Sequence, residues 1–139
     1  MIPGRKLQWD GERREVLIDL GGVTLEGTLA LPEAAQGLVL FAHGSGSSRH
    51  SPRNRYVALI LQSQQIGTLL FDLLTRREES VDQYSGELRF DIPFLAGRLV
   101  GATRWVMSSA GTQDLRMGYF GASTGACCER KDCSASRLQ

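Results

Sequence analysis

Apolar and polar residues alternate in the first third of the chain. Residues 14–31 contain two runs in which every second position is apolar, and Gly21-Gly22 separates them. A period of two is that of a strand with one buried face. A Gly-Gly pair between two such runs is a hairpin signal. The pattern therefore predicts a β-hairpin near the N-terminus.

Three short, mostly apolar runs follow, at residues 37–43, 68–72 and 115–121. Runs of this length without alternation are typical of strands that are buried on both faces. They predict three central strands, the second of which begins directly after Gly67.

Two segments between these strands have helical spacing. Residues 53–65 place Tyr56, Leu59, Ile60 and Ser63 on one face, beside Val57 and Leu61, and residues 91–109 carry apolar side chains at helical intervals. Asp91 can cap the longer helix, and Pro93 is tolerated in a first turn. We expect the polar residues 75–87 to form a loop.

The predicted order is hairpin, strand, helix, strand, helix, strand. Alternating strands and helices imply a parallel sheet with right-handed crossovers and helices on both faces. The fold class is therefore α/β, with three layers, a mainly parallel sheet and an N-terminal hairpin.

The composition limits which classes of partner the protein is expected to have. The chain has 139 residues, and its 16 Lys+Arg nearly balance 15 Asp+Glu, which gives a net charge of +1. This balance does not favour a nucleic-acid partner. No apolar run reaches the roughly 18 residues of a membrane helix, and the charged N-terminus lacks the apolar centre of a signal peptide. We expect a soluble cytoplasmic protein without a membrane partner.

Candidate chemistry begins at the end of the last predicted strand. Gly121-Ala-Ser123-Thr-Gly125 matches G-x-S-x-G in the strand context that this motif requires. The serine of the motif lies on a tight strand-to-helix turn, and the two glycines relieve crowding there. The alternative is a turn rich in Gly and Ser that merely closes a strand.

A second motif, His43-Gly44-Ser45-Gly46, follows an earlier central strand. Backbone N–H groups near Ser45, together with the N–H of Thr124, could stabilise a developing oxyanion. The alternative is a phosphate-binding loop. Against it, the segment lacks the third glycine of a dinucleotide fingerprint, and the chain has no Gly-Lys-Ser/Thr triplet.

With these two motifs, residues 14–125 resemble the N-terminal part of an α/β-hydrolase of the dienelactone hydrolase-like branch. The resemblance implies a serine nucleophile at Ser123, oxyanion donors at Ser45 and Thr124, and a small-molecule acyl substrate. The namesake enzymes use a cysteine nucleophile, so lactone specificity does not carry over, and an ester or related acyl bond is expected. The stretches that carry the resemblance are VTLEGTLALP, LVLFAHGSGSSRHSPRN, GTLLFDLLT, FDIPFLAGRLVGATRWV and MGYFGASTGA.

The family's triad cannot be assembled from these residues. Its order along the chain is nucleophile, acid, histidine, yet no histidine follows Ser123. We expect His43 to be structural and His50 to be a solvated or loop-bracing residue rather than a base, and Asp72 does not match the position of the family's acid. The chain is therefore expected to be an incomplete, inactive hydrolase domain. The alternative is a non-catalytic binding or interaction module with a hydrolase half-fold.

Composition changes abruptly after residue 125. Residues 126–139 contain no glycine and hold all three cysteines, Cys127, Cys128 and Cys133. This spacing matches no standard zinc pattern, so we expect neither a metal nor another cofactor and hold a metal or redox protein as the least favoured alternative. We interpret residues 1–125 as hydrolase domain, truncated after the nucleophile strand, and 126–139 as an atypical tail of the kind that a frame shift would produce.

Two surface expectations follow. Arg49, Arg53 and Arg55 surround His50 and form either a solvated basic run, which we favour, or a receptor for an anionic substrate group. If residues 115–121 form the last strand, that strand becomes an edge with partly exposed apolar side chains. An exposed edge predicts self-association.

Overall fold

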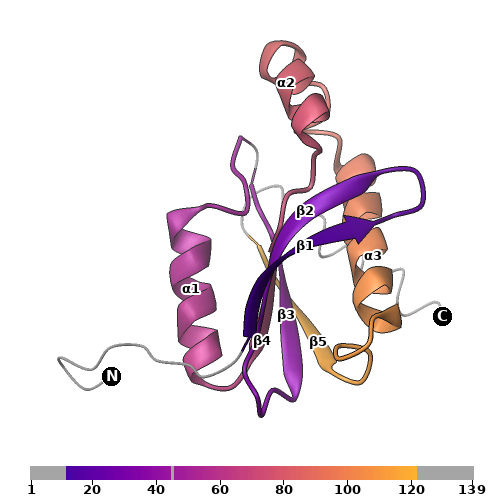
Figure 1. Cartoon of the computed structure of the whole chain (residues 1–139). Helices are drawn as coiled ribbons and strands as arrows, with labels where there is room; N and C mark the ends of the chain where they lie inside the picture. Colours follow the sequence, from indigo (N-terminus) through magenta and orange to yellow (C-terminus); the bar gives the residue numbers. More distant parts are fainter. Residues whose placement is uncertain (1–11, 45, 122–139) are drawn as a thin grey trace.

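Strands and helices alternate along most of the chain. The computed structural model describes residues 12–44 and 46–121. Within them, the strands form one sheet in the order β1-β2-β4-β3-β5, with α1 on one face and α3 on the other (Figure 1). The elements are β1 (Glu12–Asp19), β2 (Thr24–Leu31), β3 (Gly37–Ala42), α1 (Pro52–Ser63), β4 (Gly67–Phe71), α2 (Arg76–Ser85), α3 (Ile92–Ser108) and β5 (Arg116–Gly121).

The sheet is mixed in the predicted way. β1 pairs antiparallel with β2, and β2 pairs antiparallel with β4, whereas β4, β3 and β5 run parallel to one another. The hairpin turn is closed by the Leu20 N–H, which donates to the Val23 carbonyl at 2.9 Å. Gly21 lies in this turn with a φ of +98°, a conformation that glycine adopts at little cost. The α/β fold class and the hairpin are confirmed.

Alternate residues of the central strands supply two cores. On β3, Leu38, Leu40 and Ala42 belong to the larger cluster, which lies between the sheet and α3. Phe41 belongs to a smaller cluster on the α1 side, with Ala58 of α1. Because successive strand residues point to opposite faces, a continuous apolar run supplies both layers at once.

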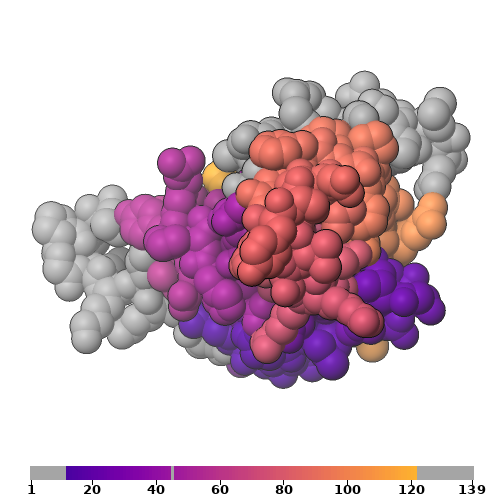
Figure 2. All heavy atoms as spheres, turned by 90° about the horizontal axis from the view of Figure 1, so that it is seen from above, coloured from indigo at the N-terminus to yellow at the C-terminus, as the bar shows by residue number. Residues whose placement is uncertain are grey.

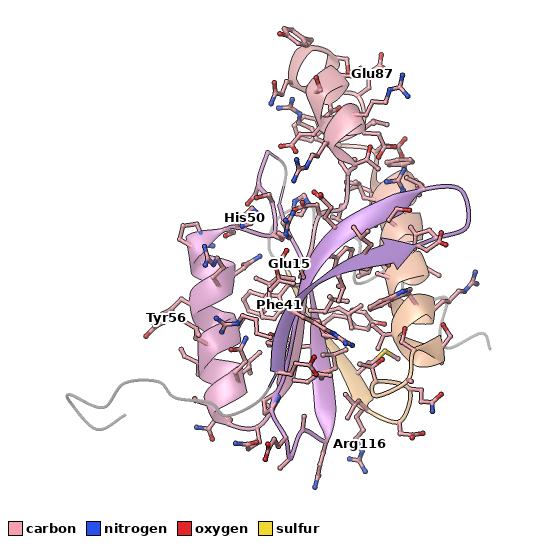
Figure 3. All side chains as sticks on the ribbon, viewed as in Figure 1. Glu15, Phe41, His50, Tyr56, Glu87 and Arg116 are labelled. Carbon is pink, nitrogen blue, oxygen red and sulfur yellow. The ribbon has the colours of Figure 1, made fainter. Side chains whose placement is uncertain are left out.

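The predicted face of α1 is only partly the face that packs on the sheet, where Val57 and Leu61 lie against the smaller cluster. Tyr56 and Ile60 are exposed, by 53% and 37%, and Figure 3 shows Tyr56 directed away from the sheet. The residues of α1 that are buried are Asn54, Ala58 and Gln62. Gln62 is satisfied there because its amide donates to the Thr68 hydroxyl of β4 at 2.8 Å, so a polar residue faces the sheet without an unpaired group.

The predicted loop at residues 75–87 was also wrong, because it contains α2. Thr75 and Glu78 form a capping box, in which the Thr75 hydroxyl accepts from the Glu78 N–H and the Glu78 carboxylate accepts from the Thr75 N–H. Gly86 ends the helix in the left-handed conformation, with a φ of +68°. The capping signals are visible in the sequence, but the helix has almost no apolar face, and its Val81 and Tyr84 are exposed.

The remaining boundaries agree closely with the sequence pattern. The carboxylate of Asp91 caps α3 by accepting from the Phe94 N–H at 3.1 Å, and a proline lies in the first turn. β5 lies at the edge of the sheet that the described residues form, and Met117, Tyr119 and Phe120 are half-buried there. In the described part of the chain, no helix is long and apolar enough to cross a membrane.

Candidate functional site

The two sequence motifs begin next to each other at the carboxyl edge of the sheet. Ala42, the last residue of β3, pairs with Gly121, the last residue of β5 and the first of the G-x-S-x-G motif. His43 and Gly44 follow Ala42 directly. From β3 the chain crosses to β4 on one side and later to β5 on the other side. Crevices at such a reversal of strand order are the usual ligand sites of α/β sheets.

Several predicted site residues lie outside the described residues. These are the proposed nucleophile Ser123 and its neighbours Thr124 and Gly125, the proposed oxyanion donor Ser45, and the three cysteines of the tail. The structure describes His43, Gly44, Gly46 and Gly121, and it brings all four to the same edge of the sheet.

Both ring nitrogens of His43 lie within hydrogen-bonding distance of backbone groups. The Leu73 N–H donates to its Nε2 at 3.0 Å, and its Nδ1 lies 2.9 Å from the Gly44 carbonyl oxygen. Because Nε2 accepts, the ring proton lies on Nδ1 and is donated to that carbonyl. Both ring nitrogens are therefore occupied by backbone groups, and the buried ring cannot take a proton from a nucleophile in this arrangement.

The loop after His43 begins with a tight turn. The Ser47 N–H donates to the Gly44 carbonyl at 3.1 Å, and Gly46 has a φ of +73°. A residue with a side chain is strained at such a φ. Glycine at position 46 therefore meets a conformational requirement of this turn.

Arg49 is held by acidic groups and does not form a free basic cluster. Its guanidinium pairs with Asp72 and lies 3.5 Å from a carboxylate oxygen of Glu26 and 3.4 Å from one of Glu15. Only 11% of its side chain is exposed. Arg53 and Arg55 are exposed. The basic residues therefore separate into Arg49, which is largely buried in an ion-pair network, and two surface side chains.

His50 is not placed beside the two motifs. It is exposed and lines a cavity of about 190 Å³ that also includes Arg55, Leu59 and Gln62 of α1 and Thr68 of β4. Figure 3 shows His50 at the start of α1. This position agrees with a loop-bordering role and gives no support to a role as base.

A second cavity, of about 250 Å³, opens beside the described motif residues. α2, which borders it, projects beyond the strands at the top of the molecule (Figures 1 and 2). The lining combines apolar and acidic side chains with the backbone of the first loop. It consists of His43, Gly44, Gly46, Ser47, Ser48, Asp72, Leu73, Leu74, Glu79, Asp82, Gln83, Arg89 and Leu95.

Asp82 is the buried carboxylate of this cavity. It accepts from the Leu88 N–H at 2.7 Å and from the Arg89 side chain at 3.0 Å. Burial alone would raise the pKa of Asp82, but the Leu88 and Arg89 hydrogen bonds outweigh burial and hold this pKa below its ordinary value. Asp82 is thus a charged group that fixes the end of α2.

A second ion pair joins α2 to α3. The Arg98 guanidinium donates to both Glu78 oxygens, at 2.8 and 2.6 Å, and to the Leu73 carbonyl at 3.1 Å. Burial raises the pKa of Glu78, whereas the hydrogen bonds from Arg98 and Thr75 lower it more, so the net pKa lies below the ordinary value of 4.5. Leu73 is therefore held at its N–H by His43 and at its carbonyl by Arg98.

Sequence reasoning missed these supporting residues. Glu78 and Arg98 are twenty positions apart, and Arg49 and Asp72 are twenty-three positions apart. Because both separations are long, no local sequence pattern indicates either ion pair. Among residues 12–44 and 46–121, no group of three or more His, Cys, Asp or Glu side chains is placed to hold a metal ion.

Comparison with known proteins shows which solved structures share this fold. No family model matches the sequence. The structure superposes on a dienelactone hydrolase from Anabaena variabilis ATCC 29413 with a TM-score of 0.90 and 51% identity, over 92% of this chain and 59% of that one. The Pyrococcus furiosus esterase Pf2001 shares the fold with a TM-score of 0.72 at 20% identity, over 91% of this chain and 48% of that one.

The described residues thus have an α/β-hydrolase fold, and the chain is similar to the N-terminal part of a protein of the dienelactone hydrolase-like branch. The resemblance drawn from the motifs is confirmed. Two Mycobacterium tuberculosis proteins, from strains CDC 1551 / Oshkosh and ATCC 25618 / H37Rv, are each named "Putative phosphoribosyl transferase". They are 52% identical over 112 residues, which is 81% of this chain but only 24% of each relative.

Proposed function

We propose that this chain carries the nucleophile half of a serine hydrolase that cleaves ester or related acyl bonds. In this proposal, the Ser123 hydroxyl oxygen attacks the substrate carbonyl carbon, and the N–H groups of Thr124 and Ser45 stabilise the oxyanion that forms. The observation that supports it is the pairing of Ala42 with Gly121, because it brings the starts of both motifs to one edge of the sheet.

In this proposal the general base, which takes the proton from Ser123, is not one of the described residues. Serine is a weak nucleophile without a base. The chain has two histidines, His43 and His50. Backbone groups occupy both ring nitrogens of His43, and His50 borders another cavity. We therefore expect the 139 residues by themselves to hydrolyse a simple activated ester no faster than a Ser123→Ala control.

The name of the mycobacterial relatives does not change this proposal. The aligned segment is about a quarter of their length, so an activity of the whole protein need not belong to it. We assign the hydrolase chemistry, and no transferase chemistry, to this segment.

A hydrolase chimera tests the proposal. Residues 12–125 would replace the matching residues of the Anabaena variabilis dienelactone hydrolase, which is 51% identical, and hydrolysis of neutral activated esters would be followed. Ser123→Ala should reduce kcat by at least about 1,000-fold. Ser80→Ala removes a hydroxyl from an exposed position of α2 and should leave kcat unchanged.

The results of the chimera experiment that would contradict the proposal are the following. A folded chimera without esterase activity, or one in which Ser123→Ala remains active, contradicts the proposal. An inactive chimera with an unchanged fold would favour the other function, a non-catalytic binding module. The intact chain would then be expected to retain a partner through gel filtration at a fixed stoichiometry.

A further inference from the structure

Two consecutive residues that follow β4 hold both ends of the loop between His43 and Arg49. The Leu73 N–H donates to His43 Nε2 at 3.0 Å, and Asp72 Oδ1 accepts from the Arg49 N–H at 2.7 Å. The loop starts at the carboxyl end of β3. The two residues that follow β4, the neighbouring parallel strand, therefore hold the first and the last residue of the loop.

The side chain of Arg49 adds a second attachment. Its guanidinium pairs with the other oxygen of Asp72 and lies close to Glu26 of β2 and Glu15 of β1. The Asp72 side chain is 15% exposed. Charge-assisted hydrogen bonds shielded from water are stronger than exposed ones. The loop is thereby tied to the hairpin as well as to β4.

From this arrangement we infer that Arg49 and Asp72 are positioning residues of the oxyanion loop. They form a clasp, defined here as the Arg49 backbone N–H and guanidinium bound to the Asp72 carboxylate. The inference rests on the proposed hydrolase function and adds to it how the first half of the oxyanion hole is kept in place.

The required accuracy explains why a clasp is useful. An oxyanion donor must lie about 2.7–3.1 Å from the oxyanion. A displacement of about 1 Å can cost roughly 100-fold in rate. The loop is rich in Gly and Ser, so its own side chains contribute little packing, and attachment at both ends restricts the backbone instead.

The clasp also indicates what the positive charge of Arg49 does in the protein. Three carboxylates surround the guanidinium, so its charge is balanced within the protein. Arg49 therefore acts on the loop and does not serve as the receptor for an anionic substrate that the basic run suggested.

The first test uses the 139-residue chain and needs no activity. Amide hydrogen exchange would be measured for Arg49 and its loop neighbours in the parent, in Asp72→Asn, which keeps an acceptor oxygen, and in Asp72→Ala, which does not. We expect the Arg49 amide to exchange at least about 10-fold faster in Asp72→Ala, with Asp72→Asn intermediate. Asp114→Asn, an exposed matched control, should match the parent.

The second test uses the hydrolase chimera. Asp72→Asn and Arg49→Gln should each lower kcat per folded molecule by roughly 10- to 100-fold with KM nearly unchanged, because the loop acts on the transition state. The double variant should be close to the stronger single variant, since both single variants remove the ion pair between the Arg49 guanidinium and the Asp72 carboxylate. Arg104→Gln, at an exposed position of α3, is the matched control.

The two tests distinguish a failure of the proposed function from a failure of the clasp or of its positioning role. An inactive parent chimera contradicts the proposed function, while the exchange data still decide whether Asp72 holds the loop. Unchanged exchange in Asp72→Ala overturns the clasp. An active parent whose Asp72→Asn variant keeps kcat, or loses activity only in proportion to unfolded protein, overturns the positioning role.

Discussion

Ala42 and Gly121 are neighbours on adjacent parallel strands, although they are far apart in the sequence. Each ends its strand, and the sequence that follows each is rich in small residues. Since parallel strands share one carboxyl edge, this register places the two glycine-containing motifs where the Gly44 turn and the start of the G-x-S-x-G segment can border one site. The functional account depends on this relationship.

The conformation of Gly46 gives a first prediction. Gly46→Ala should lower the free energy of unfolding by about 1–2 kcal/mol, because its φ of +73° disfavours a side chain. Gly97 provides a contrast, because it is exposed in α3 and an added Cβ would meet no atom within 4 Å. Gly97→Ala should stabilise the protein by about 0.5–1 kcal/mol. Chemical denaturation of both variants would check the opposite signs; equal signs would contradict this view of the turn.

The core between the sheet and α3 gives a second prediction. Leu99 is completely buried there, whereas Met107 of the same helix is 55% exposed. Leu99→Ala should cost roughly 2–5 kcal/mol of unfolding free energy, because a buried side chain is lost and a cavity is left. Met107→Ala should change stability by less than about 0.5 kcal/mol. Similar losses at the two positions would contradict the assigned faces of α3.

Acid should weaken the α2–α3 connection. The pKa of Glu78 in the folded state lies below its ordinary value of 4.5. A lowered carboxyl pKa stabilises the fold above the unfolded-state pKa, and this contribution is lost as the pH falls through the folded-state pKa. Glu78→Gln should therefore be less stable than the parent at neutral pH, and the difference should shrink below about pH 4.5.

Thermal melts at several pH values measure this difference. The exposed Glu87, changed to Gln, serves as the control and should follow the parent at every pH. A Glu78→Gln deficit that stays constant down to about pH 3 would show that the Arg98 ion pair is not its cause.

The edge position of β5 predicts association. We propose that copies of this chain pair through β5, whose Met117, Tyr119 and Phe120 are only half-buried in the described structure. Unpaired strand edges that carry apolar side chains favour such contacts. Light scattering should show a mass that rises with concentration. A monodisperse monomer that melts cooperatively in calorimetry would contradict this prediction.

Most of the fold could be predicted because local patterns carry it. The run Leu38–Phe41 is apolar throughout, and it indeed forms a strand buried on both faces. The buried face of α1 could not be predicted from α1 alone, since the hydrogen-bond partners of the buried Gln62 are Thr68 of β4 and Arg13 of β1. The helix α2 was missed because capping, and not an apolar face, defines it.

The candidate site divides in the same way. The motif residues His43, Gly44 and Gly121 were found from short spacings, and the structure brings them together. The contacts of Arg49 with Asp72 were not found, because they join a loop to a distant strand end. Long-range ion pairs leave no periodic signal in a sequence, and Arg49 looked like one member of an exposed basic run.

The central claim is that Ser123 is a nucleophile. The most direct measurement is mass spectrometry of the hydrolase chimera after treatment with a fluorophosphonate, which forms a covalent bond to an activated serine oxygen and releases fluoride. The account predicts one adduct per chain on the peptide that contains Ser123, and none after Ser123→Ala. An adduct on another residue, or no adduct on a folded chimera that hydrolyses esters, would contradict it.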